Sequence, residues 1–485
     1  MKNQHPVKIL SYCSKNMWLL IFPLLRGLAA VRIMDFNALY SWFIGAWFDI
    51  LIVILILLTG FIRWKFTGFN ADNEKIVFYS GIAARTVNEI PYASITSFTV
   101  ENRFFLRIFK AASVYIDTGS GKFSDNDMKI MVYNNDAAEI RKKIENYLRK
   151  KPQECHYNYK PRLLSTIFFS FVFSSTITGV IYIAVFFIKS GKIVEEIIQE
   201  KMIDKLSDVS HSLSVKLPVY ISPLALTIAL VFIGSWFISF IGNIMRYTGF
   251  RISIEGKTAR IKTGLLTRRS YCINTSKINY IDLRQSILTK IARVMSINVN
   301  CSGYGNSAKE IPVLIPVMHK KYAVPALNAM FPEAPVFHKS DYKPSLKFLW
   351  RYTWPSLLIC ALFVPVYFAA DYFFPLYHDA YKFLLIMAEI PSVWYVIVSI
   401  ISNRTSGISA CDESLCIKYS KGYVFHTVIA HNYHIVKTVI SQNIFQKFTD
   451  TCDITIYINS EFSTYHRLKS IKLKDAEKIQ DILVK

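Results

Sequence analysis

The segment "RYTGFRISIEGKTARIKTGLLTRR", residues 246–269, directly follows an uncharged apolar run, and "RWKFTGFNADNEKIVFYSGIAAR", residues 63–85, has a similar setting. In both segments an aromatic residue and Thr-Gly-Phe follow the apolar run, and a later Gly opens a basic turn. Aromatic residues favour the membrane–water interface, and Gly68 or Gly249 would let the chain turn into a strand. We interpret the pattern as a junction between a membrane helix and a small β-rich domain.

The composition also indicates a membrane protein. The 485 residues are 52% hydrophobic and 15% aromatic, and the mean hydropathy is +0.28. These values together exceed those of an ordinary soluble domain. The net charge of +23 does not require a nucleic-acid partner, because Lys and Arg gather beside the apolar runs, as positive-inside topology predicts.

Five apolar segments are long enough to cross a bilayer. They are residues 41–62, 163–188, 217–243, 352–370 and 383–402. A sixth segment, 17–34, is interrupted by Pro23, Arg26 and Arg32. Its basic start also fits a cleaved signal peptide, but Arg26 divides the apolar core that such a peptide needs, so we favour a retained helix.

The spans form pairs, and a polar segment follows each pair. The predicted order is hairpin 1 (1–62), domain 1 (63–162), hairpin 2 (163–243), domain 2 (244–348), hairpin 3 (349–402) and domain 3 (403–485). Within hairpin 2, apolar residues recur every three or four positions over 194–213, which predicts an amphipathic helix outside the cytoplasm.

Charge predicts the orientation of the hairpins. Lys and Arg outnumber Asp and Glu in all three polar segments, whereas the loop 189–216 holds equal numbers and 371–382 is acidic. Positive charge stays on the cytoplasmic side. We therefore expect a multi-pass membrane protein with both termini and all three domains in the cytoplasm. The eight Cys residues contain no CxxC pair, which agrees with a reducing compartment.

The three polar segments are related to one another. Gly81 aligns with Gly264, and "LRQSILTKI" (283–291) aligns with "ISQNIFQKF" (440–448). Each copy contains alternating β-branched and aromatic stretches, which predict strands. Asp136 and Asp475 are predicted N-caps of closing helices, whereas Pro325 obscures the end of the second copy. The expected fold is three small β-barrels or sandwiches, each closed by a C-terminal helix, joined to membrane helical hairpins.

These segments resemble a known family. "SGIAARTVNEIPYASITSFTVENRFFLRI" (80–108), "TGLLTRRSYCINTSKINYIDLRQSILTKI" (263–291) and, more loosely, "SKGYVFHTVIAHNYHIVKTVISQNIFQKF" (420–448) are similar to the membrane-flanked domain family. The resemblance implies a bacterial pleckstrin-homology-like (PH-like) fold for each domain. It also implies a location in the bacterial cytoplasmic (inner) membrane and a role in envelope stress tolerance.

No catalytic or cofactor motif is present in the sequence. It contains no phosphate-binding loop of standard spacing, no His-Glu-x-x-His and no Gly-x-Ser-x-Gly. "GYGNSAK" (303–309) has the wrong spacing for such a loop and is expected to be a turn. His426, His431 and His434 lie near Cys411 and Cys416, but residues three apart in a strand point to opposite faces. We therefore expect no enzyme activity, no cofactor and no metal site.

Basic residues in domain 2 are the candidate binding residues. They are Lys257, Arg260, Lys262, Arg268 and Arg269, and they surround the first predicted hairpin. Eukaryotic relatives of the PH-like fold hold phosphoinositide head groups at a comparable hairpin. The alternative that we favour is a general attraction to anionic lipid, worth about 1 kcal/mol per basic residue near the membrane surface.

Two functions are consistent with the sequence. The first is a non-enzymatic membrane scaffold whose domains contact lipid, a membrane-protein partner or a second copy of the chain. The second is a transporter or a lipid- or peptide-transfer component that uses ionisable residues in the membrane, which are costly to bury. Arg26 and Asp49 are predicted to lie at similar depth as a charge pair, and Glu389 is an isolated acid. We favour the scaffold, because no predicted span is polar enough for a conduction path.

Overall fold

The computed structural model describes residues 2–13, 47–82, 84–118, 127–148, 156–174, 205, 208–212, 223–256, 258–301, 313–330, 340–344, 348–411, 413–459 and 464–484. Several sequence predictions lie outside the described residues. These are the 17–34 span with Arg26, Lys257, the 303–309 turn and most of the 194–213 helix. Asp49 lies in a described helix, but its side chain is not described, so the pairing of Arg26 with Asp49 stays a prediction.

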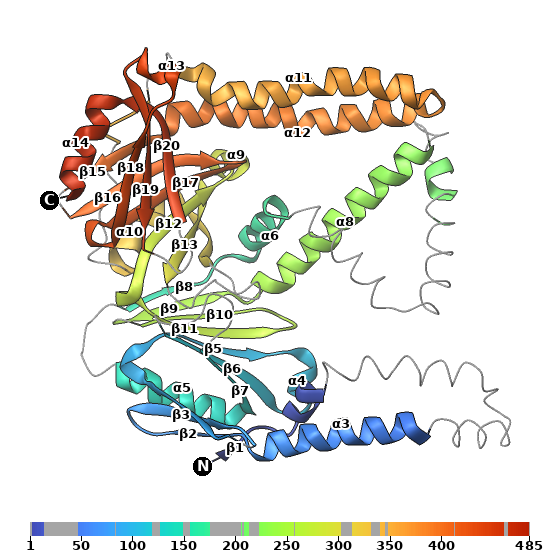
Figure 1. Ribbon diagram of the computed structural model, residues 1–485, viewed down its shortest axis with the longest axis vertical. Helices are drawn as coiled ribbons and strands as arrows, with labels where there is room; N and C mark the ends of the chain where they lie inside the picture. The colour runs from blue at the N-terminus through green and yellow to red at the C-terminus, as the bar shows by residue number, and fades with distance from the viewer. Residues whose placement is uncertain are drawn as a thin grey trace.

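One order of elements occurs three times, and we call each occurrence a unit (Figure 1). The first unit contains β2 (Gly68–Ala71), β3 (Lys75–Ser80), β4 (Thr86–Pro91), η1 (Tyr92–Ser94), β5 (Ile95–Asn102), α4 (Phe104–Ile108), β6 (Ala111–Thr118), β7 (Met128–Tyr133) and α5 (Asn134–Leu148). The second contains β9 (Arg251–Glu255), β10 (Thr258–Thr263), β11 (Arg268–Asn274), η2 (Thr275–Lys277), β12 (Ile278–Gln285), α9 (Ile287–Ile291), β13 (Val294–Cys301), β14 (Val313–His319) and α10 (Lys320–Met330).

The third unit repeats this order with β15 (Gly407–Ala410), β16 (Ser414–Lys421), β17 (Val424–His431), η5 (Asn432–His434), β18 (Ile435–Ser441), α13 (Ile444–Lys447), β19 (Thr451–Ile458), β20 (Thr464–Lys472) and α14 (Leu473–Val484). Two short strands, β1 (Lys2–Asn3) and β8 (His156–Tyr159), add to the edges of the first and second units. The predicted alternating segments therefore form strands in all three units.

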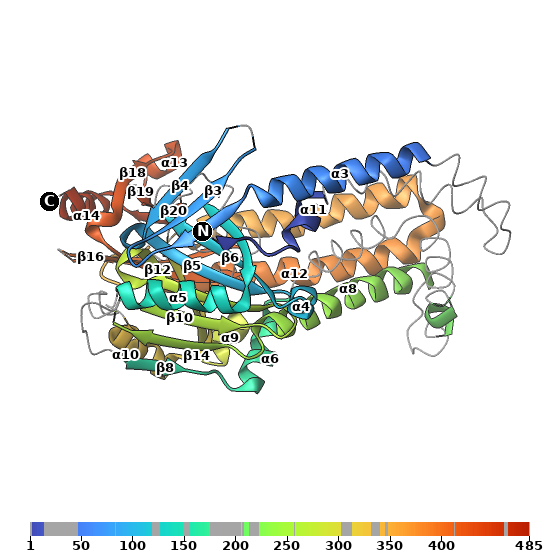
Figure 2. The same ribbon diagram turned by 90° about the horizontal axis from the view of Figure 1, so that it is seen from below.

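Long apolar helices precede the units. They are α3 (Trp47–Lys65), α8 (Pro223–Tyr247), α11 (Leu349–Phe373) and α12 (His378–Thr405), and the shorter α6 (Leu163–Val172) begins the predicted 163–188 span. Among the described residues, three helical stretches are long and apolar enough to cross a membrane: Leu226–Tyr247, Leu349–Phe373 and Pro375–Thr405. The helices α3, α8, α11 and α12 extend from the same side of the units (Figure 2).

Each unit consists of two three-stranded layers and a helix around an apolar core. In the first unit, Ile76 and Ile90 of one layer meet Val114 and Ile130 of the other, and Ile140 of α5 packs on both. All of these side chains are buried. Their burial follows from the alternation of apolar and polar residues along each strand, which places every second side chain on the core face.

Hydrogen-bonded sheets continue from one unit into the next. The sheet orders are β1-β2-β3-β4, β7-β6-β5-β11-β10-β9-β8, β14-β13-β12-β17-β16-β15 and β18-β19-β20. We call the β5–β11 contact the first join and the β12–β17 contact the second join. The sequence predicted three small barrels or sandwiches, each closed by a C-terminal helix. The structure differs because β5 and β12 pair with a strand of the following unit, so the two layers of a unit belong to different sheets.

The junction glycines differ in their role. Gly249, directly after α8, has a φ of +73°, which explains the predicted turn at this position. Gly68 begins β2 and does not have a positive φ, so the predicted turn at Gly68 is wrong. The chain turns one residue earlier there, where the Thr67 hydroxyl caps the Trp64 carbonyl at the end of α3.

The closing helices differ from the prediction in two details. Asp136 and Asp475 are not N-caps, because α5 begins at Asn134 and α14 at Leu473 and both acids lie in the first helical turn. An acidic side chain there still favours the positive end of the helix dipole. In the second unit, α10 forms despite Pro325 in its interior. Ala323, Ala326 and Leu327 are buried against the second core, so tertiary packing offsets the unfavourable proline.

Gly264 is predicted to be essential for the β10–β11 turn. Its φ is +96°, and a Cβ atom built there would lie 2.1 Å from the Thr267 carbonyl oxygen. Gly264→Ala should therefore destabilise the protein by about 1–3 kcal/mol. Gly234→Ala is the control, because a Cβ at this position in α8 meets nothing within 4 Å. Thermal unfolding of the purified protein in detergent measures both effects, and equal Tm values would contradict the prediction.

Asp453 of β19 is predicted to couple hairpin 3 to the third unit. Its Oδ2 accepts hydrogen bonds from Arg351 Nη2 of α11 at 3.0 Å and from Arg467 Nη2 at 2.7 Å. Its Oδ1 accepts from Gln446 Nε2 and from the Ser470 amide. Burial alone would raise the pKa of the Asp453 carboxyl, but these donors outweigh burial and lower the pKa below its ordinary value of 3.8.

Asp453→Asn should lower the stability by about 1–3 kcal/mol at neutral pH, because charged hydrogen bonds are lost from a buried site. The control is Asp450→Asn, which removes the same charge from an exposed residue three positions away. Because the folded pKa is lowered, the contribution of Asp453 is present above pH 3.8 and is lost as the pH falls through the folded value. A stability difference between Asp453→Asn and the unmutated chain that did not shrink in acid would oppose this assignment.

Candidate functional site: two basic pockets at the joins

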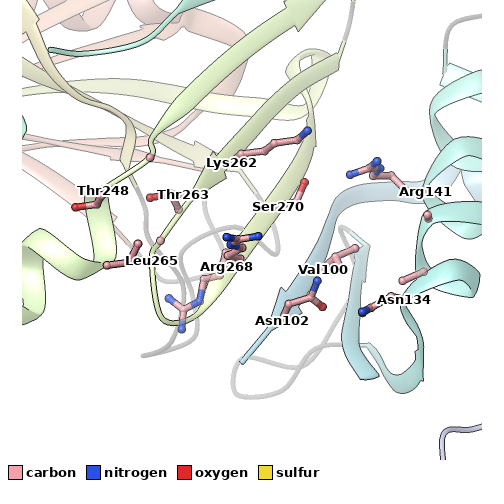
Figure 3. Close-up of a pocket in the computed structure, with 15 residues that line it drawn as sticks. Val100, Asn102, Asn134, Arg141, Thr248, Lys262, Thr263, Leu265, Arg268 and Ser270 are labelled. Carbon is pink, nitrogen blue, oxygen red and sulfur yellow. The ribbon is translucent and has the colours of Figure 1, made fainter. Parts of the chain in front are cut away.

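A basic pocket lies at each join. The first is a cavity of about 440 Å³ between α5 of the first unit and the β10–β11 hairpin of the second (Figure 3). The second is a cavity of about 520 Å³ between the second and third units. The residues directly after α8, Thr248 and Gly249, line the first pocket, and the last residues of α12, Arg404 and Thr405, line the second. Both pockets therefore lie where an apolar helix meets the strands.

Equivalent residues line the two pockets. In the first, Lys262 of β10 lies beside Ser270 of β11. In the second, Lys418 of β16 lies beside Thr427 of β17. The opposite wall also matches, with Val100 and Asn102 of β5 in the first pocket and Leu283 and Gln285 of β12 in the second.

The described lining of both pockets contains basic residues and no Asp or Glu. The first pocket has Arg141, Lys262, Arg268 and Arg269. The second has Lys290, Lys320, Lys343, Arg404 and Lys418. Figure 3 shows Arg141, Lys262 and Arg268 around the same space, although they come from two units. Such a concentration of positive charge in a concave site attracts an anion.

The first pocket also holds polar atoms with unused hydrogen-bonding capacity. Arg269 lies 3.7 Å from the Glu101 carboxylate across the first join, yet its Nε has no hydrogen-bond partner among the described residues. The Oδ1 atoms of Asn102 and Asn134 are likewise buried without a partner in the described part of the chain. Buried polar atoms are nearly always hydrogen-bonded in folded proteins, so these three atoms favour a polar ligand in the pocket.

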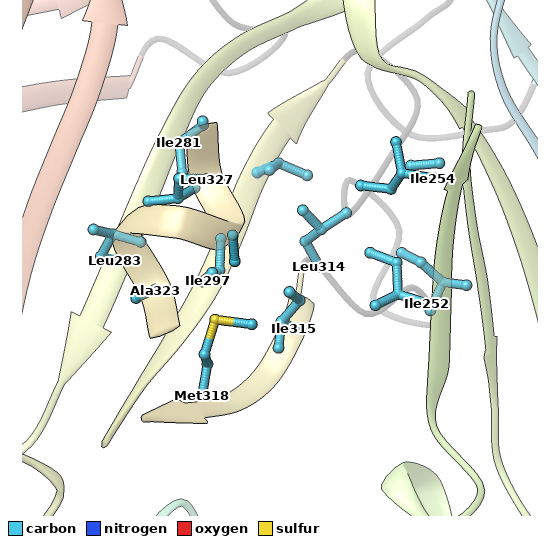
Figure 4. Packing of buried hydrophobic residues seen from close by; sticks show 14 of the residues in the cluster. Ile252, Ile254, Ile281, Leu283, Ile297, Leu314, Ile315, Met318, Ala323 and Leu327 are labelled. Carbon is cyan, nitrogen blue, oxygen red and sulfur yellow. The ribbon is translucent and has the colours of Figure 1, made fainter. Parts of the chain in front are cut away.

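The second pocket combines crowded positive charge with an apolar wall. Burial lowers the pKa of the Lys290 ammonium group, and the neighbouring Lys320 lowers it further. The Lys290 Nζ lies 4.3 Å from the centre of the Phe425 ring, which provides partial compensation. Behind this wall, Leu283 and Ala323 belong to the core of the second unit (Figure 4). An anion bound here would offset the repulsion between the two Lys residues.

The structure separates the five basic residues predicted from the sequence. Lys262, Arg268 and Arg269 line the first pocket together. Arg260 does not, because it forms ion pairs with Glu145 of α5 at 3.1 Å and with Glu255 at 3.5 Å. Lys257 lies outside the described residues.

Sequence reasoning did not predict Arg141 or the second pocket. The equivalence of Lys262 and Lys418 is the signal that could have pointed to the second pocket.

His426 lies at the second join, whereas His431 and His434 both contact the Tyr433 ring. His426 Nδ1 is 3.0 Å from Asp282 Oδ2 across the second join. His431 stacks on Tyr433, and burial lowers the pKa of His434. Among the described residues, no three His, Cys, Asp or Glu side chains form a group that could hold a metal ion. His426 therefore contributes a contact across the second join.

Glu389 lies within α12. One of its carboxylate oxygens is buried and has no hydrogen-bond partner among the described residues.

Three short helices carry exposed apolar side chains. In α4 and the residue after it, Phe105 and Phe109 are 74% and 55% exposed, and in α13 and the residue after it, Phe445 and Phe448 are 78% and 83% exposed. In α9, Ile291 is 73% exposed. Figure 1 shows α4, α9 and α13 at the edge of the units from which the long helices extend. Apolar side chains in this position suit the membrane–water interface.

The strand units, their closing helices and the adjoining apolar helices define a membrane-associated protein built from PH-like domains. A family model described as "Bacterial PH domain" matches residues 23–148 and 212–326. The chain therefore belongs to the bacterial PH-like domain family. Comparison with curated proteins and with solved structures finds no match. The third unit lies outside the matched residues but has the same order of elements.

The basic pockets are predicted to retain anionic lipid. Removing two basic residues from one pocket, in Arg141→Gln/Lys262→Gln, should weaken binding of phosphatidylglycerol about 30-fold, since each charge contributes about 1 kcal/mol. Lys142→Gln, which removes an exposed charge next to Arg141, is the control. Native mass spectrometry of the full chain, with phosphatidylglycerol and phosphatidylcholine offered together, measures the retained lipid. Equal retention by both variants would contradict the prediction.

Proposed function

We propose that this protein is a non-enzymatic scaffold of the bacterial inner membrane whose PH-like units contact anionic lipid and other membrane components. In this proposal the termini and all three units lie in the cytoplasm. The single observation that carries the proposal is the pair of equivalent basic pockets beside the ends of α8 and α12, with no acidic residue among their described lining residues.

The neighbouring short helices support the same function. Their exposed phenylalanine and isoleucine side chains would enter the interfacial layer of the bilayer. Basic residues flank them: Arg103, Arg107 and Lys110 at α4, Lys290 and Arg293 at α9, and Lys447 at α13. Apolar insertion and attraction to anionic head groups would together hold the units against the membrane surface.

A transfer function is the second candidate, and Glu389 is the observation that favours it. An acidic side chain with a buried, unpaired oxygen inside an apolar helix is costly and therefore often functional. If the protein transfers a lipid or peptide, Glu389→Gln should abolish transfer between reconstituted vesicles while leaving lipid retention in the pockets unchanged. Unchanged transfer, or none in the unmutated chain, would exclude this function for Glu389.

Nitroxide labelling tests the membrane-surface function. Labels at Phe105→Cys and Phe445→Cys in the full chain, reconstituted with phosphatidylglycerol, should be accessible to oxygen in the lipid and shielded from a water-soluble nickel complex. A label at Lys142→Cys on α5 should show the opposite behaviour. Each spectrum is compared with that of the unmutated chain treated identically, because native cysteines are present. Equal access of the nickel complex at all three positions would refute the docking of α4 and α13 in the membrane.

A further inference from the structure

The two joins use the same strands in the same register. In each join, the fourth strand of one unit pairs antiparallel with the third strand of the next. Ser97 lies opposite Ile273 in the first join, and Tyr280 lies opposite Ala430 in the second. At the other end of the paired segment, Asn102 lies opposite Arg268, and Gln285 lies opposite Phe425. The joins are therefore two copies of one interface.

The first and third units each present one half of this interface without a partner strand in the described residues. The third strand of the first unit, β4, is the edge of its sheet, and the fourth strand of the third unit, β18, is the edge of its own. β4 is largely exposed, and every residue of β18 is exposed or partly exposed. By contrast β5, which occupies the position of β18 in the first unit, is almost fully buried. Edge strands leave backbone N–H and C=O groups free to pair with another chain.

The short helix beside β18 also lacks the contact that its counterpart makes. Ile287 of α9 is 6% exposed and packs on Phe425 of the third unit and Val398 of α12. Ile444 occupies the same position in α13 and is 72% exposed. In the first join, Arg107 of α4 donates a hydrogen bond to the Leu265 carbonyl in the β10–β11 turn. Lys447 is the corresponding residue of α13, and Ile82 is the corresponding residue of the β3–β4 turn.

We propose that β18 of one copy of this protein pairs antiparallel with β4 of a second copy, in the register of the two joins. This register places Ile440 opposite Val87, which brings two β-branched apolar side chains together. It also places Ser441 opposite Thr86, at the position that Glu101 and Arg269 hold in the first join and Arg284 and His426 hold in the second. The partner is thus a second copy, because the chain itself carries both halves of the interface.

The membrane permits this assembly. Across the two joins, the helices α3, α8, α11 and α12 all lie on one side of the units (Figure 2). A contact of the same geometry between two copies therefore keeps the helices of both copies on that side. The contact is heterologous, since β18 and β4 are different surfaces. It therefore produces a row or a ring of copies within the membrane plane.

Two charged residues make this contact weaker than the joins. Glu89 of β4 occupies the position of Cys272 and Ile429, which are buried in the cores of the preceding units. Lys437 of β18 occupies the position of Ser97 and Tyr280. Charges at sheet edges oppose uncontrolled pairing. The end-to-end contact is accordingly reversible, whereas the joins are permanent parts of the fold.

Cross-linking in the membrane tests the proposal. The full chain carrying Val87→Cys and Ile440→Cys, treated with a short thiol-specific bifunctional reagent, should give dimers and longer oligomers. The control carries Val87→Cys and Val436→Cys, since Val436 is 70% exposed on the same strand but lies about 13 Å further along it. Each single variant gives the background from native cysteines, and melting in detergent verifies that every variant is folded.

Adding Glu89→Ile and Lys437→Tyr to the cross-linking pair should increase the oligomer yield several-fold at the same protein density. Oligomers that appear equally with the control pair would overturn the proposal, as would the absence of oligomers in the chain that retains Glu89 and Lys437. Oligomers formed only after both charges are removed would also overturn it. That last result would mean that Glu89 and Lys437 keep copies apart.

Discussion

Backbone hydrogen bonding between units is the interaction on which the rest of this structure depends. The β5–β11 and β12–β17 pairings place strands of neighbouring units in one sheet, and the side chains of one unit then complete the core of another. Cys272 belongs to the core of the first unit, and Cys416 and Ile429 belong to the core of the second. A unit removed from its neighbours would lose part of its core as well as a strand partner.

The joins also determine where the pockets lie. Arg141 and Lys262 are far apart in the sequence and come from different units, and the first join brings them to one cavity. In the same way, the second join places Lys290 beside Phe425. An apolar helix ends beside each basic cavity, and in the proposed topology this is the level of the lipid head groups. The strand pairing that joins the units thus also forms the candidate binding pockets.

Much of the fold follows from local sequence patterns. Alternation identifies β3, β5, β6, β12 and β19 as strands, and hydropathy identifies α8, α11 and α12. The joins could not be predicted from alternation, because it reports which face of a strand is buried and does not report which strand lies alongside. The sequence nevertheless contains one signal of the joins, which lies in β11 and β17. Tyr271, Cys272 and Ile273 are consecutive buried residues, as are Val428, Ile429 and Ala430, which is typical of strands covered on both faces. The corresponding segment of β4, Asn88-Glu89-Ile90, lacks this run.

The shared sheets have a consequence for biosynthesis. β5 ends at Asn102 and its partner β11 begins at Arg268, so the two strand ends lie 166 positions apart in the sequence. At a translation rate of about 5–20 residues per second, roughly ten to thirty seconds pass before β11 emerges. Hairpin 2 is made within this interval. The first unit therefore remains incomplete, with β5 unpaired on one edge, while hairpin 2 is synthesised. Correct insertion of hairpin 2 thus becomes a condition for completing the first unit, which was synthesised before it.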